Sequence, residues 1–169
     1  MKTKSITLIS IIFALAVFRL LPHLPNVSPV AAMALFGGAY FADKRMALII
    51  PLVALLITDF ILGLHNTMIF VYAGFALTVA TGLWLQSRVT AVNVLLAALF
   101  SSLMFFVLTN FGAWLFTGLY APTSEGLMQA YVAAIPFFQN SLFGNLVFTA
   151  VIFGAYELLK NNVQALRQA

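Results

Sequence analysis

Long apolar runs separated by short polar segments make up almost the whole chain. Six apolar segments can be delimited, at Ser5–Leu21, Ser28–Phe41, Met46–Gly63, Thr67–Leu85, Val92–Leu115 and Phe137–Leu159. The runs are continuous, whereas a transmembrane barrel would show short alternating segments, so each run predicts a membrane-spanning helix. The second segment is shorter than the roughly 20 apolar residues that a span needs, so we expect it to be tilted, bent or partly re-entrant.

Composition excludes an ordinary soluble domain. The chain has 169 residues, of which 63% are hydrophobic and 7% are charged, whereas soluble domains carry about 25% charged residues. We therefore predict an all-α integral membrane protein, a single domain over residues 1–169 that forms one bundle of six transmembrane helices.

The region before the sixth segment combines a long connection with a proline. The connection around Gly118–Gly126 is long for so small a bundle, and such loops are often lids or binding elements. Leu127–Ile135 is expected to form a short surface helix that ends before Pro136, because proline disfavours helix continuation.

The distribution of basic residues predicts the orientation of the bundle. With six spans, one side collects nearly all of them: Lys2, Lys4, Lys44, Arg45, Arg88, Lys160 and Arg167. By the positive-inside rule this side is the cytoplasm, so both termini are predicted to be cytoplasmic. The same residues are too scattered for a nucleic-acid-binding surface, so no nucleic-acid partner is expected.

Arg19 and Asp59 are charged residues in apolar surroundings. In the six-span arrangement both lie near the outer interface, where an ion pair would neutralise two costly charges. One interpretation is a structural clamp between the first and third spans. A second is that one or both contact a polar ligand, and a third is a role in proton relay.

Two histidines lie near the same outer end. His23 follows the first span and His65 follows the third. Two histidines and an aspartate could bind a metal, but their spacing matches no metal motif, and contact with an organic ligand or no ligand role are the other readings. The chain has no cysteine, which excludes disulfides and thiolate ligands. We predict no resident metal or cofactor.

Further polar side chains are predicted at the outer ends of the last two spans. Asn110 and Trp114 are four residues apart, hence on one helical face, and Asn140 opens the sixth span. An amide and an indole suit a planar ligand. The other interpretation, which we favour, is that Trp114 belongs to the interfacial aromatic belt and Asn110 bonds another helix.

Small residues recur along the second segment. Ala34, Gly38 and Ala42 are spaced by four residues, a pattern that allows a second helix to approach closely. That helix could belong to this chain or to a partner protein.

Four stretches resemble a known family. They are Asn26–Phe41, Asp59–His65, Thr109–Gly112 and Ala134–Asn140. In this order they resemble a family of small bacterial membrane proteins of unassigned function, which is similar to the S components of energy-coupling factor (ECF) transporters, the membrane subunits that capture vitamins. The resemblance covers about Asn26 to Gly154.

The resemblance implies a six-helix bundle in the bacterial cytoplasmic membrane with an outward-facing cavity, closed by the loops after spans one, three and five. It also implies a separate energising module, a transmembrane subunit with two ATPases, which the stripe of small residues could contact. We therefore expect a substrate-binding subunit for uptake of a vitamin-like or polar organic molecule. The outer site would consist of Arg19, Asp59, His65, Asn110, Trp114 and Asn140.

Two other classes of function remain open. The chain could be a structural or assembly membrane protein whose buried polar groups only lock helices together. An intramembrane enzyme using Asp59 and His65 is the third class, but the sequence contains no P-loop, H-E-x-x-H or G-x-S-x-G motif. We therefore predict that the protein is not an enzyme.

Overall fold

A computed structural model describes residues 2–167, and every regular element among them is a helix. The helices are α1 (Lys2–Arg19), α2 (Val30–Tyr40), α3 (Lys44–Leu62), α4 (Met68–Leu85), α5 (Ala91–Phe116), α6 (Ser124–Asn162) and α7 (Gln164–Arg167). Side-chain caps begin three of them, since Asp43, Thr90 and Thr123 accept hydrogen bonds from the backbone N–H groups of Arg45, Asn93 and Gly126.

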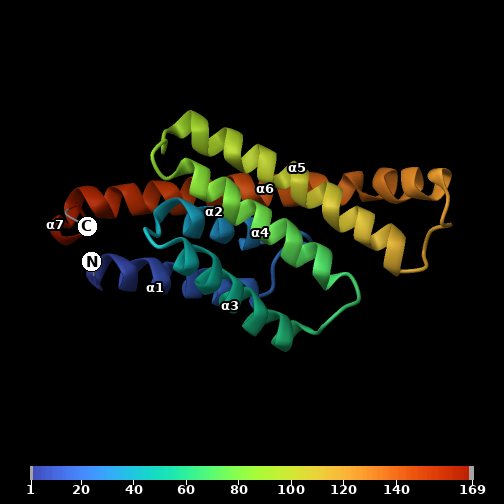
Figure 1. The fold of residues 1–169 in the computed structure, drawn as a ribbon, viewed down its shortest axis with the longest axis horizontal. Coiled ribbons are helices and arrows are strands. Elements are labelled where there is room, and N and C mark those ends of the chain that lie inside the picture. Colours follow the sequence, from blue (N-terminus) through green and yellow to red (C-terminus); the bar gives the residue numbers. More distant parts are fainter. Residues whose placement is uncertain (1, 168–169) are drawn as a thin grey trace.

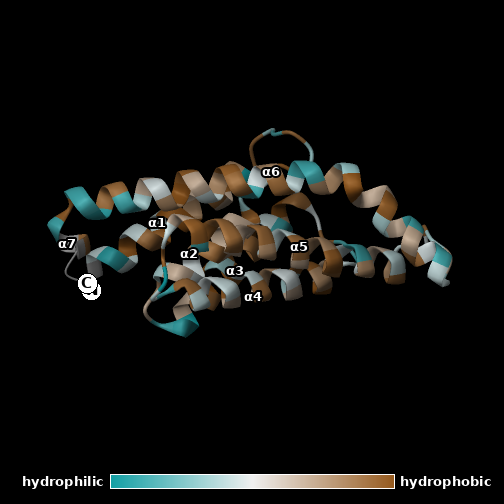
Figure 2. Cartoon of the chain, turned by 90° about the horizontal axis from the view of Figure 1, so that it is seen from above, coloured by the Kyte–Doolittle hydropathy of each residue, from teal (hydrophilic) through white to brown (hydrophobic). Residues whose placement is uncertain are grey.

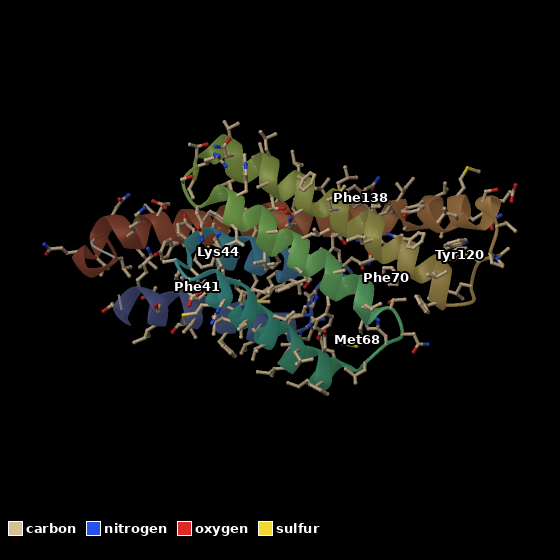
Figure 3. All side chains as sticks on the ribbon, viewed as in Figure 1. Phe41, Lys44, Met68, Phe70, Tyr120 and Phe138 are labelled. Carbon is tan, nitrogen blue, oxygen red and sulfur yellow. The ribbon has the colours of Figure 1, made fainter. Side chains whose placement is uncertain are left out.

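The helices run side by side along the longest axis of the molecule (Figure 1). The N- and C-terminal segments share one end with the α2–α3 and α4–α5 connections, and the α3–α4 and α5–α6 connections lie at the other. Phe41 and Lys44 mark the first end and Tyr120 the second (Figure 3). We call these ends the terminus end and the far end.

Four of the described helices, α3, α4, α5 and α6, are long and apolar enough to cross a membrane. Large apolar side chains are exposed along them, for example Phe60 at 66%, Ile69 at 69% and Val92 at 65%. Figure 2 shows hydrophobic colours along the helices and hydrophilic colours at the ends. These features are consistent with the predicted all-α membrane protein.

The short helix α2 is the centre of the bundle. It contacts each of α1, α3, α4, α5 and α6, and every residue in it except Ala31 is buried. Its 11 residues are about 17 Å long, clearly less than the roughly 30 Å of a hydrocarbon core. A helix that is apolar on all sides is stable only when other elements surround it, which is its position here.

The prediction for the start of the sixth segment was wrong. Leu127–Ile135 and Phe137–Leu159 form one helix, α6, of 39 residues with Pro136 inside it. Figure 2 shows that α6 bends in its N-terminal part, which is how a helix accommodates a proline that lacks an N–H group and crowds the preceding turn. The other five predicted segments agree with α1–α5 to within three residues at each boundary.

Candidate functional site

The ion pair expected between Arg19 and Asp59 is present near the far end. Arg19 is in the last turn of α1, and its Nη2 lies 2.7 Å from Oδ1 of Asp59 in the last turn of α3. The Asp59 side chain is 4% exposed and that of Arg19 is 18% exposed. A carboxylate buried to this degree needs a charged or hydrogen-bonding partner, and Arg19 is that partner.

Two further hydroxyl groups complete this cluster. Tyr72, on α4, donates a hydrogen bond of 2.8 Å from its OH to Oδ2 of Asp59. Arg19 Nη1 donates to Oγ1 of Thr58, which in turn donates to the backbone carbonyl oxygen of Leu55. Both carboxylate oxygens therefore have donors from the chain, and the cluster connects α1, α3 and α4.

The two histidines make only local contacts. Nδ1 of His23 lies 2.7 Å from the carbonyl oxygen of Leu21, and Nδ1 of His65 lies 2.9 Å from Oγ1 of Thr67. Within residues 2–167, no group of three or more histidine, aspartate or glutamate side chains is placed to hold a metal ion. His23 and Arg19 do line a shallow hollow of about 470 Å³, to which His65 does not contribute.

Asn110 lies in a different cavity, of about 450 Å³, between α4, α5 and α6. Its polar lining comes from Thr109 and Asn110 on α5, Ser141 on α6, and Asn26 in the α1–α2 connection. The apolar walls are formed by Val71, Phe105, Phe106, Ala134, Phe137 and Phe138. We call this the amide cavity. It combines hydrogen-bonding groups with aromatic surface and contains no charged residue among those that line it.

The connection between α1 and α2 covers one side of the amide cavity. Asn140 Nδ2 donates to the carbonyl oxygen of Pro25 over 3.2 Å, and Asn26, with φ of 64°, has the left-handed backbone conformation that asparagine tolerates. Gly144 lies on α6, the helix that carries Asn140, and a Cβ there would lie 3.0 Å from Val27 Cα. The α1–α2 connection is therefore in close contact with α6. Asn140 therefore holds the wall of the cavity from outside and is not among its lining residues.

Trp114 lies on α5 one turn beyond Asn110 and supports a loop. Its indole Nε1 donates to the carbonyl oxygen of Ala121 over 2.9 Å, and its ring is 5.5 Å from that of Phe111. This contact ties the α5–α6 connection back onto α5. Trp114 does not line the amide cavity.

The six residues of the predicted outer site therefore do not share one site. Arg19 and Asp59 form the buried cluster with Tyr72, Asn110 lines the amide cavity, and His65 is exposed in the α3–α4 connection. The aromatic walls and Tyr72 were not predicted. Tyr72 is a lone phenol inside an apolar run one turn into α4, and such a group needs a partner when it is buried.

The stripe of small residues lies mainly inside the bundle. Ala34 is 0% exposed, and a Cβ on Gly38 would lie 2.3 Å from the carbonyl oxygen of Val79 on α4. A Cβ on Gly82 would likewise lie 2.3 Å from the carbonyl oxygen of Leu35. The helix that approaches Gly38 is therefore α4 of this chain, while Ala42 is exposed just after α2.

Comparison with known proteins places the chain in a family. The model of the Family of unknown function (DUF6580) matches residues 1–166, so the chain belongs to that family. No curated protein and no solved structure matches the chain.

Proposed function

We propose that the protein is a substrate-binding membrane subunit that captures a small, uncharged, vitamin-like organic molecule in the amide cavity. The observation that carries this proposal is the cavity itself. Its volume of about 450 Å³ is within the 300–1,000 Å³ or so that is typical of small-molecule sites. Mostly apolar walls with a few polar groups are also typical of such sites.

The polar lining indicates the chemistry of the ligand. Thr109 donates its hydroxyl hydrogen to the carbonyl oxygen of Phe105, and Asn110 donates one amide hydrogen to that of Phe106. The acceptor atoms of both side chains are left for a ligand that donates hydrogen bonds. Because no residue in the described part of the chain that lines this cavity is charged, a ligand with a full charge would lose its hydration without gaining an ion pair.

The proposal includes a topology. All six helices from α1 to α6 would cross the bacterial cytoplasmic membrane, with α2 as a short central crossing extended by the connection that precedes it. The positive-inside rule would put the terminus end in the cytoplasm and the amide cavity in the outer half of the membrane. By the resemblance to ECF S components, energy for uptake would come from a separate transmembrane subunit with ATPases.

A structural or assembly protein is the second candidate, and one observation favours it. Polar side chains of the predicted outer site already have partners within the chain: Arg19 with Asp59, Trp114 with Ala121, and Asn140 with Pro25. Polar groups of this kind can serve only to fix helices and loops in position.

Native mass spectrometry on gently purified protein separates the two candidates. We expect one small organic molecule bound to the wild type and absent from Asn110→Ala. Asn162→Ala is the matched control, because Asn162 makes the same bond to the fourth preceding carbonyl, 3.0 Å against 2.8 Å for Asn110, but lies at the terminus end.

A thermal-shift measurement with the identified molecule completes this test. A hundredfold excess over the dissociation constant should stabilise the wild type and Asn162→Ala by about 2.7 kcal/mol and leave Asn110→Ala unchanged. If the wild type carries no bound mass and no compound in a vitamin and cofactor panel stabilises it, the structural role is the better reading.

A further inference from the structure

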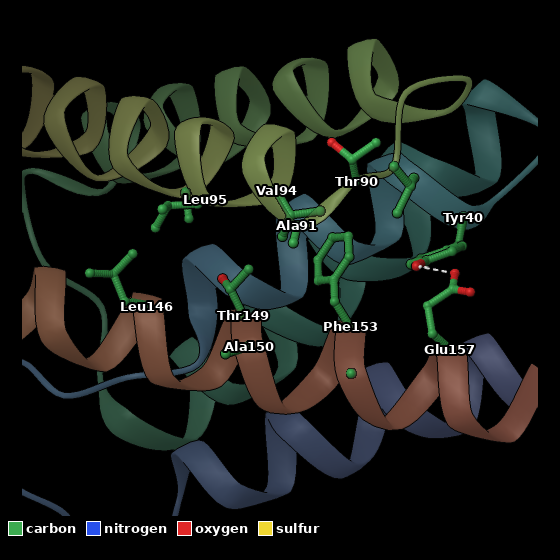
Figure 4. Close-up of a pocket in the computed structure, with 13 residues that line it drawn as sticks. Tyr40, Thr90, Ala91, Val94, Leu95, Leu146, Thr149, Ala150, Phe153 and Glu157 are labelled. Atoms are coloured by element: carbon green, nitrogen blue, oxygen red, sulfur yellow. Dashed lines mark hydrogen bonds between the residues drawn. The ribbon is translucent and has the colours of Figure 1, made fainter.

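A second cavity lies between α5 and α6 at the terminus end (Figure 4). It has a volume of about 450 Å³ and is lined mainly by apolar side chains, among them Val94, Leu95, Leu146 and Phe153. We call it the α5–α6 groove. Both of its helices are long and apolar enough to cross a membrane, so the groove opens towards hydrocarbon where these helices are embedded in lipid.

The floor of the groove has space that no other part of the described chain fills. A Cβ added at Gly154 would meet no atom within 4 Å, and Ala150, one turn earlier, is exposed. Unfilled apolar surface of this kind, between two apolar helices, is suited to a flexible hydrocarbon chain.

The groove continues into a polar pocket at the terminus end. This pocket has a volume of about 390 Å³, and Tyr40, Val89 and Glu157 line both the pocket and the groove. Lys4 and Lys160 also line the polar pocket. In the described part of the chain, Glu157 is the one carboxylate that lines this pocket, so the two lysines give the pocket net positive charge. We call it the basic pocket.

Glu157 is held at the boundary between the two cavities. Its Oε1 accepts a hydrogen bond of 2.8 Å from the OH of Tyr40 (Figure 4), and Lys160 Nζ lies 3.4 Å from Oε2. The carboxylate is therefore oriented by its neighbours, and the apolar groove and the basic pocket meet at a defined point.

We propose that the α5–α6 groove and the basic pocket together form a binding site for one phospholipid of the leaflet at the terminus end. An acyl chain lies along the groove over Ala150 and Gly154, and the phosphate lies in the pocket beside Lys4 and Lys160. Apolar surface facing hydrocarbon, with cationic groups at headgroup depth, matches a phospholipid in both position and charge. A soluble molecule would fit only the polar half of this site.

The test fills the groove and measures lipid retention by native mass spectrometry. Protein is reconstituted with equal amounts of phosphatidylglycerol and phosphatidylcholine, extracted in mild detergent, and scored for bound phospholipid. We expect one phospholipid on the wild type and at least a tenfold loss in Gly154→Leu, because the leucine side chain occupies the open floor. Ala155→Leu is the matched control, since Ala155 is exposed on the same helix and does not line the groove.

A second variant tests the headgroup contact. Lys160→Gln should reduce the preference for phosphatidylglycerol several-fold, whereas Lys160→Arg should keep it. Circular dichroism should show the same helix content in all variants. Leucine is a better helix former than glycine and nearly as good as alanine, and lysine, glutamine and arginine have similar helix propensities.

Three outcomes would overturn this proposal. Equal lipid retention in Gly154→Leu and the wild type would show that the groove is not the site, and equal retention in Ala155→Leu and Gly154→Leu would show a non-specific effect. A wild-type dimer that becomes monomeric in Gly154→Leu would assign the groove to a protein helix instead. The site is separate from the amide cavity, so Asn110→Ala should retain the phospholipid whichever function is correct.

Discussion

The contribution of the Arg19–Asp59 pair depends on how completely its charges are surrounded. The whole Asp59 residue is 3% exposed. It forms an ion pair with Arg19 of α1 and accepts a hydrogen bond from the OH of Tyr72 on α4. Transfer of such charges out of water is costly, so a buried ion pair adds little net stability to the protein. Removal of one partner is strongly destabilising, because the other charge stays buried without a counter-ion. At the scale of single residues, this cluster fixes three helices relative to one another.

Asp59→Asn should reduce the free energy of unfolding by about 3 to 5 kcal/mol, because Arg19 keeps a buried charge without a counter-ion. The double variant Arg19→Met/Asp59→Leu should recover most of this loss, since two apolar residues leave no uncompensated charge. Tyr72→Phe removes one hydrogen bond and should cost about 1 kcal/mol. Unfolding in detergent by increasing denaturant measures all three.

The opposite pattern would assign the pair to a ligand. If Asp59→Asn has the stability of the wild type and loses a bound small molecule, then Arg19 and Asp59 contact substrate and are not a clamp.

Among the elements, α2 depends most on its surroundings. It is too short to span a bilayer alone, and the close contact at Gly38 and Gly82 sets its distance from α4. On its other side, a Cβ at Gly37 would lie 2.5 Å from Cγ of Pro51 on α3. Glycine at these contacts lets the backbones approach closely, which strengthens dispersion contacts between helices in lipid.

Gly82→Ala should therefore destabilise the bundle by about 1 to 3 kcal/mol, because the new methyl group forces α2 and α4 apart. Gly154→Ala is the matched control, since its Cβ meets open space and alanine favours the helix by up to about 1 kcal/mol. The midpoints of thermal unfolding in the same detergent compare the two variants. Equal midpoints would mean that the α2–α4 contact relaxes without cost.

At the scale of the whole molecule, the ends of the bundle differ in charge. The terminus end carries basic residues such as Lys44, Arg88 and Lys160, while the far end carries the Arg19–Asp59 cluster. With six crossings, the positive-inside rule makes the terminus end cytoplasmic. The absence of cysteine from the sequence makes this topology directly testable by single-cysteine labelling.

An impermeant maleimide should label Asn66→Cys and Ser124→Cys in intact cells, and Ser87→Cys and Asn161→Cys only after permeabilisation. All four positions are exposed. His23→Cys decides whether α1 and α2 cross: labelling in intact cells requires six crossings, and protection in intact cells with labelling after permeabilisation contradicts them. The four other positions behave identically with four crossings or six, and they serve as orientation controls.

The apolar runs and the isolated charges were enough to predict α1 to α5 and the need to pair Arg19 with Asp59. Hydropathy determines where helices can lie in lipid, and a charge placed there requires a partner, so both followed from local composition and depth. Interactions between residues that are distant in the chain could not be predicted in this way. The proline rule suggested a break at Pro136, but α6 continues through it with a bend.

Which polar groups share a site depends on how the helices pack against one another. Asn26, Val71, Asn110 and Ser141 come from four separate parts of the chain and meet in one cavity, while Trp114, on the same helix as Asn110, bonds a loop. Likewise, the small residues of α2 predicted a close contact, but which helix makes it depends on how the other helices pack around α2. Both contacts depend on how distant segments pack in three dimensions. The pattern of residues along one segment carries no information about that packing.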